Sequence, residues 1–292
     1  MKHLLVVLAI VLAFASMAIA YEPPGITYYI GGISEGDVPT IDGFVDDWAF
    51  MPRAYYWTGA DFRAASEDPN GQPGVSTSYA TGEVAKDDYD ILGCYIGWAP
   101  STNMYYIGVN VTDSELYFPE EEIGGTWKED HLQFLLNPNG EGGNFRKCDP
   151  PNAIGQQWYL ALDPRNEAQP LGFFGNAEGQ EWSWVPPWAF YGIQKSATGW
   201  SAEVGLALWD FLDVTEATSV RHTITAGETF GGNVYIGDRD PDGEDCGTTF
   251  NFADAWTDAS LFAAFYMVSP EETGRVTAVE SSTWGSIKST FK

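Results

Sequence analysis

The segment Tyr105-Tyr106-Ile107-Gly108-Val109-Asn110-Val111-Thr112 decides the fold class, because apolar side chains recur in it at every second position. That period is typical of a half-buried β-strand. The residues that it places on the core face are Tyr105, Ile107, Val109 and Val111.

Five further segments show the same alternation: His131–Leu136, Trp158–Leu162, Ala202–Leu208, Asn233–Gly237 and Ala263–Met267. Clusters of Gly, Pro, Asn and Asp separate them and supply the fixed or positive φ angles of turns. No amphipathic helix of convincing length precedes the C-terminus. The sequence therefore predicts an all-β protein, an antiparallel β-sandwich of jelly-roll-like type with long loop insertions and a short C-terminal helix.

Three parts are expected along the chain: a signal peptide over residues 1–20, one β-sandwich domain over 21–268, and a tail over 269–292. In the tail, Thr283 is expected to cap a short helix that carries Trp284, Ile287 and Phe291 near one face. This helix either docks on its own domain or engages a partner.

The N-terminus has the parts of a secretory signal. Lys2 and His3 precede an apolar run from Leu4 to Ile19, and Ala18-Ile19-Ala20 offers the small residues of a cleavage site. A membrane anchor is the alternative, but the run is short for a span of about 20 residues. We expect the mature protein to be secreted, either extracellular or periplasmic.

The mature chain is strongly acidic. All 41 acidic residues lie beyond residue 20, whereas Lys2 leaves with the signal, so 13 basic residues remain and the formal charge is −28. This charge repels phosphate backbones and anionic lipids, which argues against nucleic acid and membranes as partners. It suits Ca²⁺ and neutral sugars.

The segment Asp238-Arg239-Asp240-Pro241-Asp242-Gly243 is the candidate metal site. Alternate carboxylates before a turn glycine bring oxygen atoms together around a hard cation, so Asp238, Asp240 and Asp242 are the expected ligands of a structural Ca²⁺. The match to a helix-flanked calcium loop is partial, because the twelfth position is Thr249. A solvated acidic turn is the alternative.

The three cysteines leave at least one thiol unpaired. Cys94 lies on the apolar face of an alternating segment and is expected to be a buried thiol. Cys148 and Cys246 both lie in loop-like sequence, and an exported protein could join them in a disulfide.

Four patches follow one another along the chain: Ile41–Trp48, the strands around Tyr106–Asp113 and Trp127–Phe134, Gly199–Val204, and Gly232 to Phe262. In this order they resemble the family 9 carbohydrate-binding modules. Together they cover about residues 38–268. The resemblance implies a β-sandwich that binds the end of a sugar chain between two tryptophans, which map to Trp127 and Trp256.

The resemblance also implies hydrogen-bonding partners for the sugar. The family's acid falls on Gln133, and its arginine falls near Tyr159. A charge-assisted pair has become neutral here, so each hydrogen bond to a sugar should be weaker. The aromatic segment Trp182–Trp188 is either a replacement platform or a packed loop.

Sequence signatures of catalysis are missing, including the zinc-protease, nucleophile-elbow and phosphate-loop motifs. We therefore predict a secreted, non-catalytic protein of carbohydrate catabolism that binds oligo- or polysaccharide, with a polysaccharide-degrading enzyme as a partner. One alternative is a haem-binding electron-transfer domain of a related sandwich type, with His131 and either Met104 or Met267 as axial ligands. Another is a surface or cell-wall scaffold protein.

Cleavage of the signal is directly testable. We predict that the exported protein begins at Tyr21, because Ala18 and Ala20 occupy the positions that signal peptidase reads. Intact-mass spectrometry of protein recovered outside the cytoplasm measures this. A mass that still includes residues 1–20 contradicts it.

Overall fold

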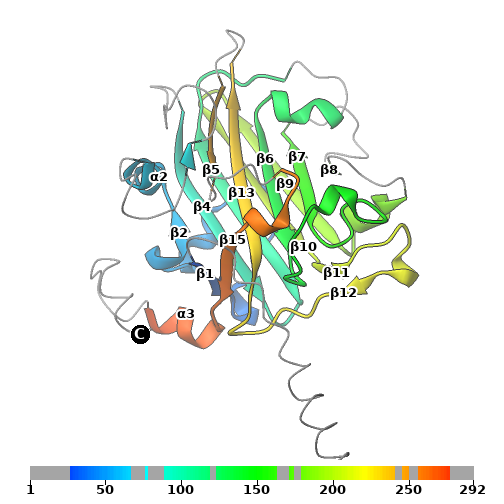
Figure 1. The fold of residues 1–292 in the computed structure, drawn as a ribbon. Coiled ribbons are helices and arrows are strands. Elements are labelled where there is room, and N and C mark those ends of the chain that lie inside the picture. Colours follow the sequence, from blue (N-terminus) through cyan, green and yellow to red (C-terminus); the bar gives the residue numbers. More distant parts are fainter. Residues whose placement is uncertain are drawn as a thin grey trace, which may run out of the picture.

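The computed structural model describes residues 27–66, 76–77, 89–118, 123–162, 171–173, 179–240, 245–249 and 256–276 (Figure 1). Strands dominate this part of the chain, and the predicted all-β class is confirmed. Within the same residues, no helix has the length and apolar character needed to cross a membrane.

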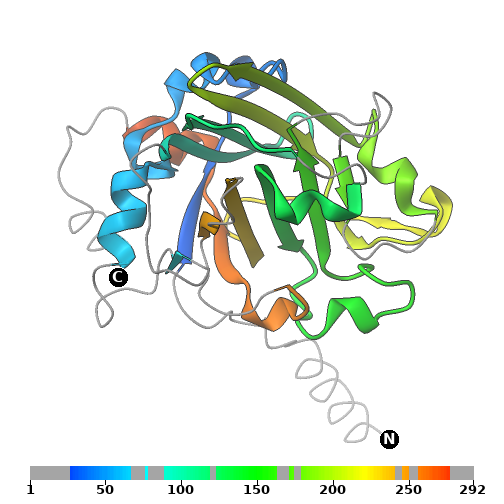
Figure 2. The same ribbon diagram turned by 90° about the horizontal axis from the view of Figure 1, so that it is seen from above.

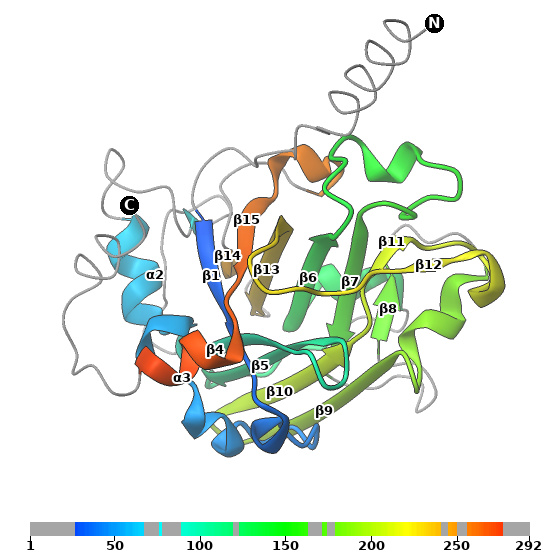
Figure 3. The same ribbon diagram turned by 90° about the horizontal axis from the view of Figure 1, so that it is seen from below.

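The main strands form one sheet that curls into two facing layers (Figures 2 and 3). Layer A runs in the order β8 (Leu171–Phe173), β7 (Gln156–Ala161), β6 (His131–Asn137), β13 (Thr229–Arg239), β15 (Ala263–Met267) and β1 (Thr27–Gly32). Layer B continues from β1 through β4 (Asp90–Ala99), β5 (Met104–Thr112), β10 (Gly199–Leu206) and β9 (Ala189–Ser196).

Shorter elements complete the fold. The remaining strands are β2 (Tyr56–Trp57), β3 (Ser76–Thr77), β11 (Trp209–Phe211), β12 (Val220–Arg221) and β14 (Asp245–Thr249). The helices are α2 (Gly59–Ser66), α3 (Pro270–Val276) and the 3-10 turns η1 (Glu35–Asp37), η2 (Asp46–Phe50), η3 (Arg53–Tyr55), η4 (Ile123–Lys128), η5 (Phe145–Lys147), η6 (Gln180–Trp184), η7 (Glu216–Thr218) and η8 (Ala259–Leu261). The helix expected after Thr283 lies outside the described residues.

The sheet is mixed, which corrects the prediction of a purely antiparallel sandwich. Strand β1 pairs in parallel with β15 through Thr27–Ile30 and with β4 through Gly31–Gly32. The N-terminal strand thereby joins the two layers. Side-chain alternation reports which face a residue occupies but not the direction of the neighbouring strand, so the sequence could not reveal this.

The core lies between the layers, on the faces that alternation predicts. From layer B it includes Ile107, Val109 and Val111, and from layer A it includes Leu132 and Phe134. Cys94 is fully buried in the same cluster, as predicted, and burial raises the pKa of its thiol.

The predicted disulfide between Cys148 and Cys246 is not formed in this structure, where Cys148 is a free thiol. Cys148 packs against the cluster that contains Leu135, towards the C-terminal end of β6. Cys246 pairs with Asp238 of β13, beside the N-terminal end of β6. A strand of 7 residues spans roughly 20 Å, far beyond the ~6 Å that separates the Cα atoms of a disulfide. Loop-like sequence around both cysteines carried no information on this separation.

A buried carboxylate ties two of the quoted patches together. Glu203 on β10 accepts hydrogen bonds from the backbone N–H groups of Asp42 and Gly43, at 3.0 and 2.9 Å, and from Trp48 Nε1 at 2.7 Å. Gly43 has a φ of +91°, and a Cβ there would lie 2.6 Å from the Ile193 nitrogen. Ser201 Oγ also donates to the Gly43 carbonyl at 2.6 Å and Gln194 Nε2 to the Asp42 carbonyl at 2.8 Å, so side chains of β9 and β10 fasten the loop before η2 to the outer face of layer B.

We predict that Glu203→Gln destabilises the fold by about 1–3 kcal/mol at pH 5, because the NH2 group that replaces one carboxyl oxygen cannot accept and leaves at least one of the three N–H donors unpaired. Burial raises the pKa of Glu203 to about 7 from 4.5, although its hydrogen bonds act the other way. The folded state therefore holds a proton that the unfolded state releases near pH 4.5. The stability from this proton is fully present below that pH and is lost as the pH rises through 7.

Urea unfolding at pH 5 and pH 8 measures both effects. The destabilisation caused by Glu203→Gln should be larger at pH 5 than at pH 8. Glu216→Gln on η7, where the side chain is exposed, is the matched control and should change stability by less than about 0.5 kcal/mol. Equal, small effects of both substitutions would show that Glu203 does not anchor the loop.

Candidate functional site

A polar and aromatic row crosses the outer face of layer A. Because alternate residues of β6 face opposite ways, Leu132 and Phe134 enter the core while His131 and Gln133 point outward. Gln133 lies opposite Tyr159 on β7 and opposite Tyr235 on β13. The structure thus brings Gln133 and Tyr159, both predicted from sequence, into direct cross-strand contact, and it leaves both buried.

Hydrogen bonds extend this row along the sheet. Gln157 Nε2 donates to the Tyr159 hydroxyl at 3.2 Å, and Arg146 Nη2 on η5 donates to Gln157 Oε1 at 3.0 Å. Arg146 was missed by sequence reasoning, since it lies in an insertion that matches no known pattern. It places a positive charge beside Gln157, the hydrogen-bond partner of Tyr159, near which the resemblance puts an arginine.

His131 lies among the aromatic rings of this face. Its ring centroid is 5.4 Å from that of Tyr159 and 5.3 Å from that of Tyr235. Burial lowers the pKa of His131 to about 3, the charge of Arg239 lowers it further, and the neighbouring Gln133 side chain acts in the opposite direction. The imidazole is therefore neutral at ordinary pH.

The two predicted platform tryptophans belong to different segments near this layer. Trp256 is half-buried and packs edge-on against Tyr235 of β13, with ring centroids 5.6 Å apart. Trp127 belongs to η4, which contacts β7 and β8, and its side chain is 43% exposed. Lys128 Nζ lies 5.5 Å from the Trp127 ring centroid.

The fourth sequence patch holds Trp256 in place. Asp258 caps η8 by accepting from the Ser260 N–H at 2.9 Å, and Ser260 Oγ accepts from the Gly143 N–H at 2.7 Å. The Phe145 N–H donates to the Thr257 carbonyl at 3.1 Å. These bonds fasten the segment after Trp256 to the loop that carries Arg146.

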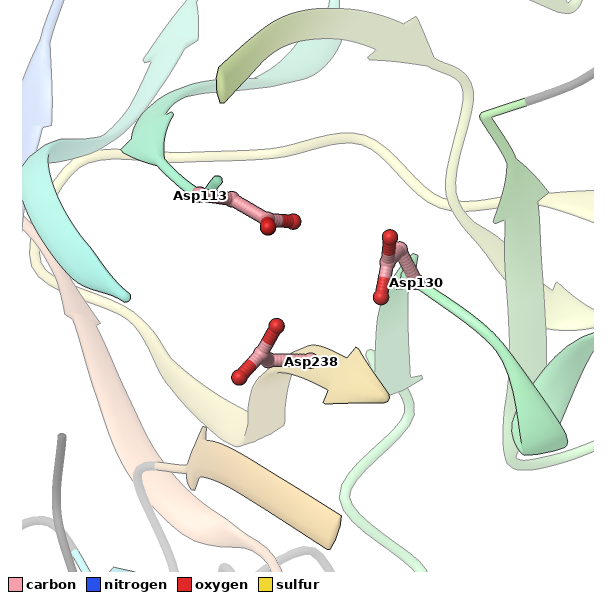
Figure 4. A group of neighbouring side chains, drawn as sticks. All are labelled: Asp113, Asp130 and Asp238. Carbon is pink, nitrogen blue, oxygen red and sulfur yellow. The ribbon is translucent and has the colours of Figure 1, made fainter. Parts of the chain in front are cut away.

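Three carboxylates gather at one end of the molecule, between the layers (Figure 4). Asp113 follows β5, Asp130 precedes β6, and Asp238 lies near the end of β13. One oxygen from each lies within 4.8 Å of the others, and all three side chains are buried. Oxygen donors in such a group suit a hard cation such as Ca²⁺.

Backbone groups orient Asp130 within this group. Asp130 accepts from the N–H of Tyr117 at 2.7 Å and from the N–H of Arg239 at 2.9 Å. Burial raises its pKa to about 8, these two hydrogen bonds act the other way, and the negative charges of Asp113 and Asp240 raise it again. The group is therefore electrostatically costly unless protons or a cation compensate it.

Of the three ligands predicted from the acidic segment, the structure brings only Asp238 into this group among the described residues. Asp240 lies close enough to Asp130 to affect its pKa, and Asp242 lies outside the described residues. Strand β13 ends at Arg239, so the strand positions Asp238, whereas Asp240 follows the end of the strand. Asp113 and Asp130 were present in the quoted strand patches, but nothing in their spacing indicated that they meet Asp238.

The proposed haem ligands do not assemble. His131 points to the outer face of layer A, whereas Met267 lies in the core between the layers. Met104 belongs to the separate cluster on the other side of layer B. The intervening sheet therefore separates His131 from either methionine.

The aromatic segment Trp182–Trp188 packs against the β11–β12 hairpin. Trp182 and Trp188 contact the ring of Trp209 at centroid distances of 4.9 and 5.2 Å. The Arg221 guanidinium lies 5.2 Å from the Trp188 ring centroid. The structure favours the packed loop over a replacement sugar platform.

Two solved structures share this architecture, both of a family 9 carbohydrate-binding module from Caldicellulosiruptor kristjanssonii. The complex with cellotriose aligns with a TM-score of 0.53 and 14% identity, over 87% of this chain and 99% of that chain. The complex with glucose gives a TM-score of 0.54 and 13% identity, over 84% and 96%. No family model and no curated protein matched the sequence.

The chain therefore has the fold of the family 9 carbohydrate-binding modules, as the four sequence patches predicted.

Proposed function

We propose that this chain is a secreted, non-catalytic carbohydrate-binding protein that holds the end of an oligo- or polysaccharide between Trp127 and Trp256. The observation behind the proposal is that both residues lie near the row Tyr235–Gln133–Tyr159: Trp256 packs edge-on against Tyr235, and the turn η4, which carries the exposed Trp127, contacts β7 and β8. The fold supports it, since solved structures of this fold hold cellotriose and glucose.

The chemistry of the face suits a pyranose. Flat indole rings bury the C–H faces of a sugar with little loss of conformational freedom. Area burial of this kind contributes about 1–3 kcal/mol for each well-covered ring. The amide of Gln133 and the hydroxyl of Tyr159 supply directional hydrogen bonds beneath the rings.

The charges of the face support binding over hydrolysis. Most glycoside hydrolases use two carboxyl groups, about 5–9.5 Å apart, on either side of the scissile bond. The side chains that we place on this face, among the described residues, are neutral or cationic. We propose that the protein acts in carbohydrate catabolism beside a separate polysaccharide-degrading enzyme, whose substrate it concentrates.

We predict that Trp127→Ala and Trp256→Ala each weaken binding of a soluble oligosaccharide at least tenfold, about 1.4 kcal/mol. The reason is the loss of one stacking surface while the fold persists. Isothermal titration calorimetry with cellotriose, after a glycan array has tested other neutral sugars, measures this.

Phe190→Ala is the matched control, because Phe190 is an exposed aromatic residue on β9 of layer B. It should leave the affinity unchanged. Wild-type affinity in both tryptophan variants would place the sugar elsewhere. A wild-type protein that binds no sugar on the array would favour the scaffold-protein alternative.

We also propose a structural Ca²⁺ held by Asp113, Asp130 and Asp238. The convergence of three buried carboxylates supports it, since a cation turns their mutual repulsion into attraction. Such an ion would join the ends of β5 and β13 to the start of β6, across the two layers. Asp240 would contribute negative charge nearby.

Calcium binding to the folded state alone raises stability by about 2.7 kcal/mol at a hundredfold excess over the dissociation constant. We therefore predict that EDTA lowers the melting temperature, that millimolar Ca²⁺ restores it, and that Asp130→Asn removes the response. Asp240→Asn should reduce the response less than Asp130→Asn does. Differential scanning fluorimetry measures all four effects.

Sodium chloride at matched ionic strength is the control, because general screening also relieves repulsion. Equal stabilisation by Na⁺ and Ca²⁺ would exclude a specific ion. A stronger effect of Asp240→Asn than of Asp130→Asn would show that the acidic segment Asp238–Gly243, and not the three converging carboxylates, holds the ion.

A further inference from the structure

Two neighbouring buried groups on β6 have unused hydrogen-bonding capacity. Gln133 lies beside His131 on the same face, and each side chain is 1% exposed. In the part of the chain that the structure describes, neither His131 Nε2 nor Gln133 Nε2 has a hydrogen-bond partner. A buried polar atom without a partner costs about 1–3 kcal/mol, so both atoms need a ligand or a water.

The geometry fixes which hydrogen-bonding group His131 presents. His131 Nδ1 lies 2.6 Å from the carbonyl oxygen of Glu129. A carbonyl oxygen accepts and cannot donate, so Nδ1 carries the hydrogen atom. In the neutral ring, Nε2 then presents a lone pair.

The position of the ring is held from three directions. Its cross-strand neighbours are the small residues Ala161 and Gly237, and a Cβ at Gly237 would lie 2.5 Å from His131 Cε1. The ring therefore lies over Gly237, between the aromatic rings of Tyr159 and Tyr235. The unused Nε2 atom belongs to the same face as the tryptophans of the proposed sugar site.

We infer that His131 is a specificity-determining residue of this site and accepts a hydrogen bond from a hydroxyl group of a neutral sugar, while Gln133 donates to the same or an adjacent hydroxyl. This inference rests on the proposed function. A hydroxyl both donates and accepts, and so complements a lone pair next to an amide N–H. A carboxylate only accepts, and its oxygen atoms would face the lone pair of His131. The pair therefore selects neutral over uronic-acid residues.

The test compares cellotriose and xylotriose with trigalacturonate, using wild-type protein and two variants. His131→Phe keeps a flat ring and removes the acceptor, whereas His131→Gln keeps an acceptor. We expect wild type to bind a neutral probe at least tenfold more tightly than trigalacturonate. His131→Phe should lose at least tenfold in affinity for the neutral probe, and His131→Gln should lose clearly less.

Nitrogen-15 NMR of the histidine rings tests the unmodified protein in case His131→Phe fails to fold. Saturation with the neutral probe should shift the Nε2 resonance of His131, while Nδ1 stays protonated. His222 is the internal control, because both of its ring nitrogens already face carboxylates, Asp210 at 2.7 Å and Glu228 at 3.2 Å.

The outcomes separate the inference from the proposed function. If a neutral probe binds but His131→Phe keeps full affinity, or if the Nε2 resonance stays unchanged on saturation, the pair holds only water and the inference is wrong. Equal or tighter binding of trigalacturonate also overturns it, while sugar binding stands. If wild type binds no neutral sugar, either on the glycan array or among these probes, both the inference and the proposed function fail.

Discussion

Strand β6 is buried on both faces along all 7 of its residues, and much of the structure follows from this constraint. Its inner face packs against layer B and needs apolar side chains. Its outer face carries His131 and Gln133, whose polar groups must find partners once water is excluded. A strand in the middle of a layer that is polar on one side therefore needs hydrogen-bond partners on that side. The aromatic and amide side chains of β7 and β13 lie around these polar groups.

The same strand connects the two candidate sites. Asp130 and His131 are adjacent, so the backbone that orients the carboxylate group also positions the first residue of the polar row. The two groups nevertheless face different surroundings. Asp130 lies with Asp113 and Asp238 at the end of the space between the layers, whereas His131 lies outside layer A. An ion at the first would stiffen the end of the sheet that supports the second.

The quoted sequence patches turn out to have structural functions. Glu203 binds the loop that contains Asp42 and Gly43, and Asp258 caps the turn that follows Trp256. A buried carboxylate with several N–H donors tolerates few substitutes, because each donor left unpaired is costly. Such residues carry information about the fold and less about the ligand.

Local sequence determined the strands and their buried faces, because the alternation of side chains along a strand is a property of the backbone itself. It also determined the absence of long helices in the described part of the chain, the burial of Cys94 and the family-like fold. The resemblance added the candidate residues Trp127, Gln133, Tyr159 and Trp256. What only the tertiary structure decided was which distant residues meet. The parallel insertion of β1, the meeting of Asp113 and Asp130 with Asp238, the approach of Arg146 to the polar row and the separation of Cys148 from Cys246 depend on how the sheet curls. Curling brings strand ends together that are about 100 residues apart in the chain, and the side-chain period along a single strand contains no information about that distance.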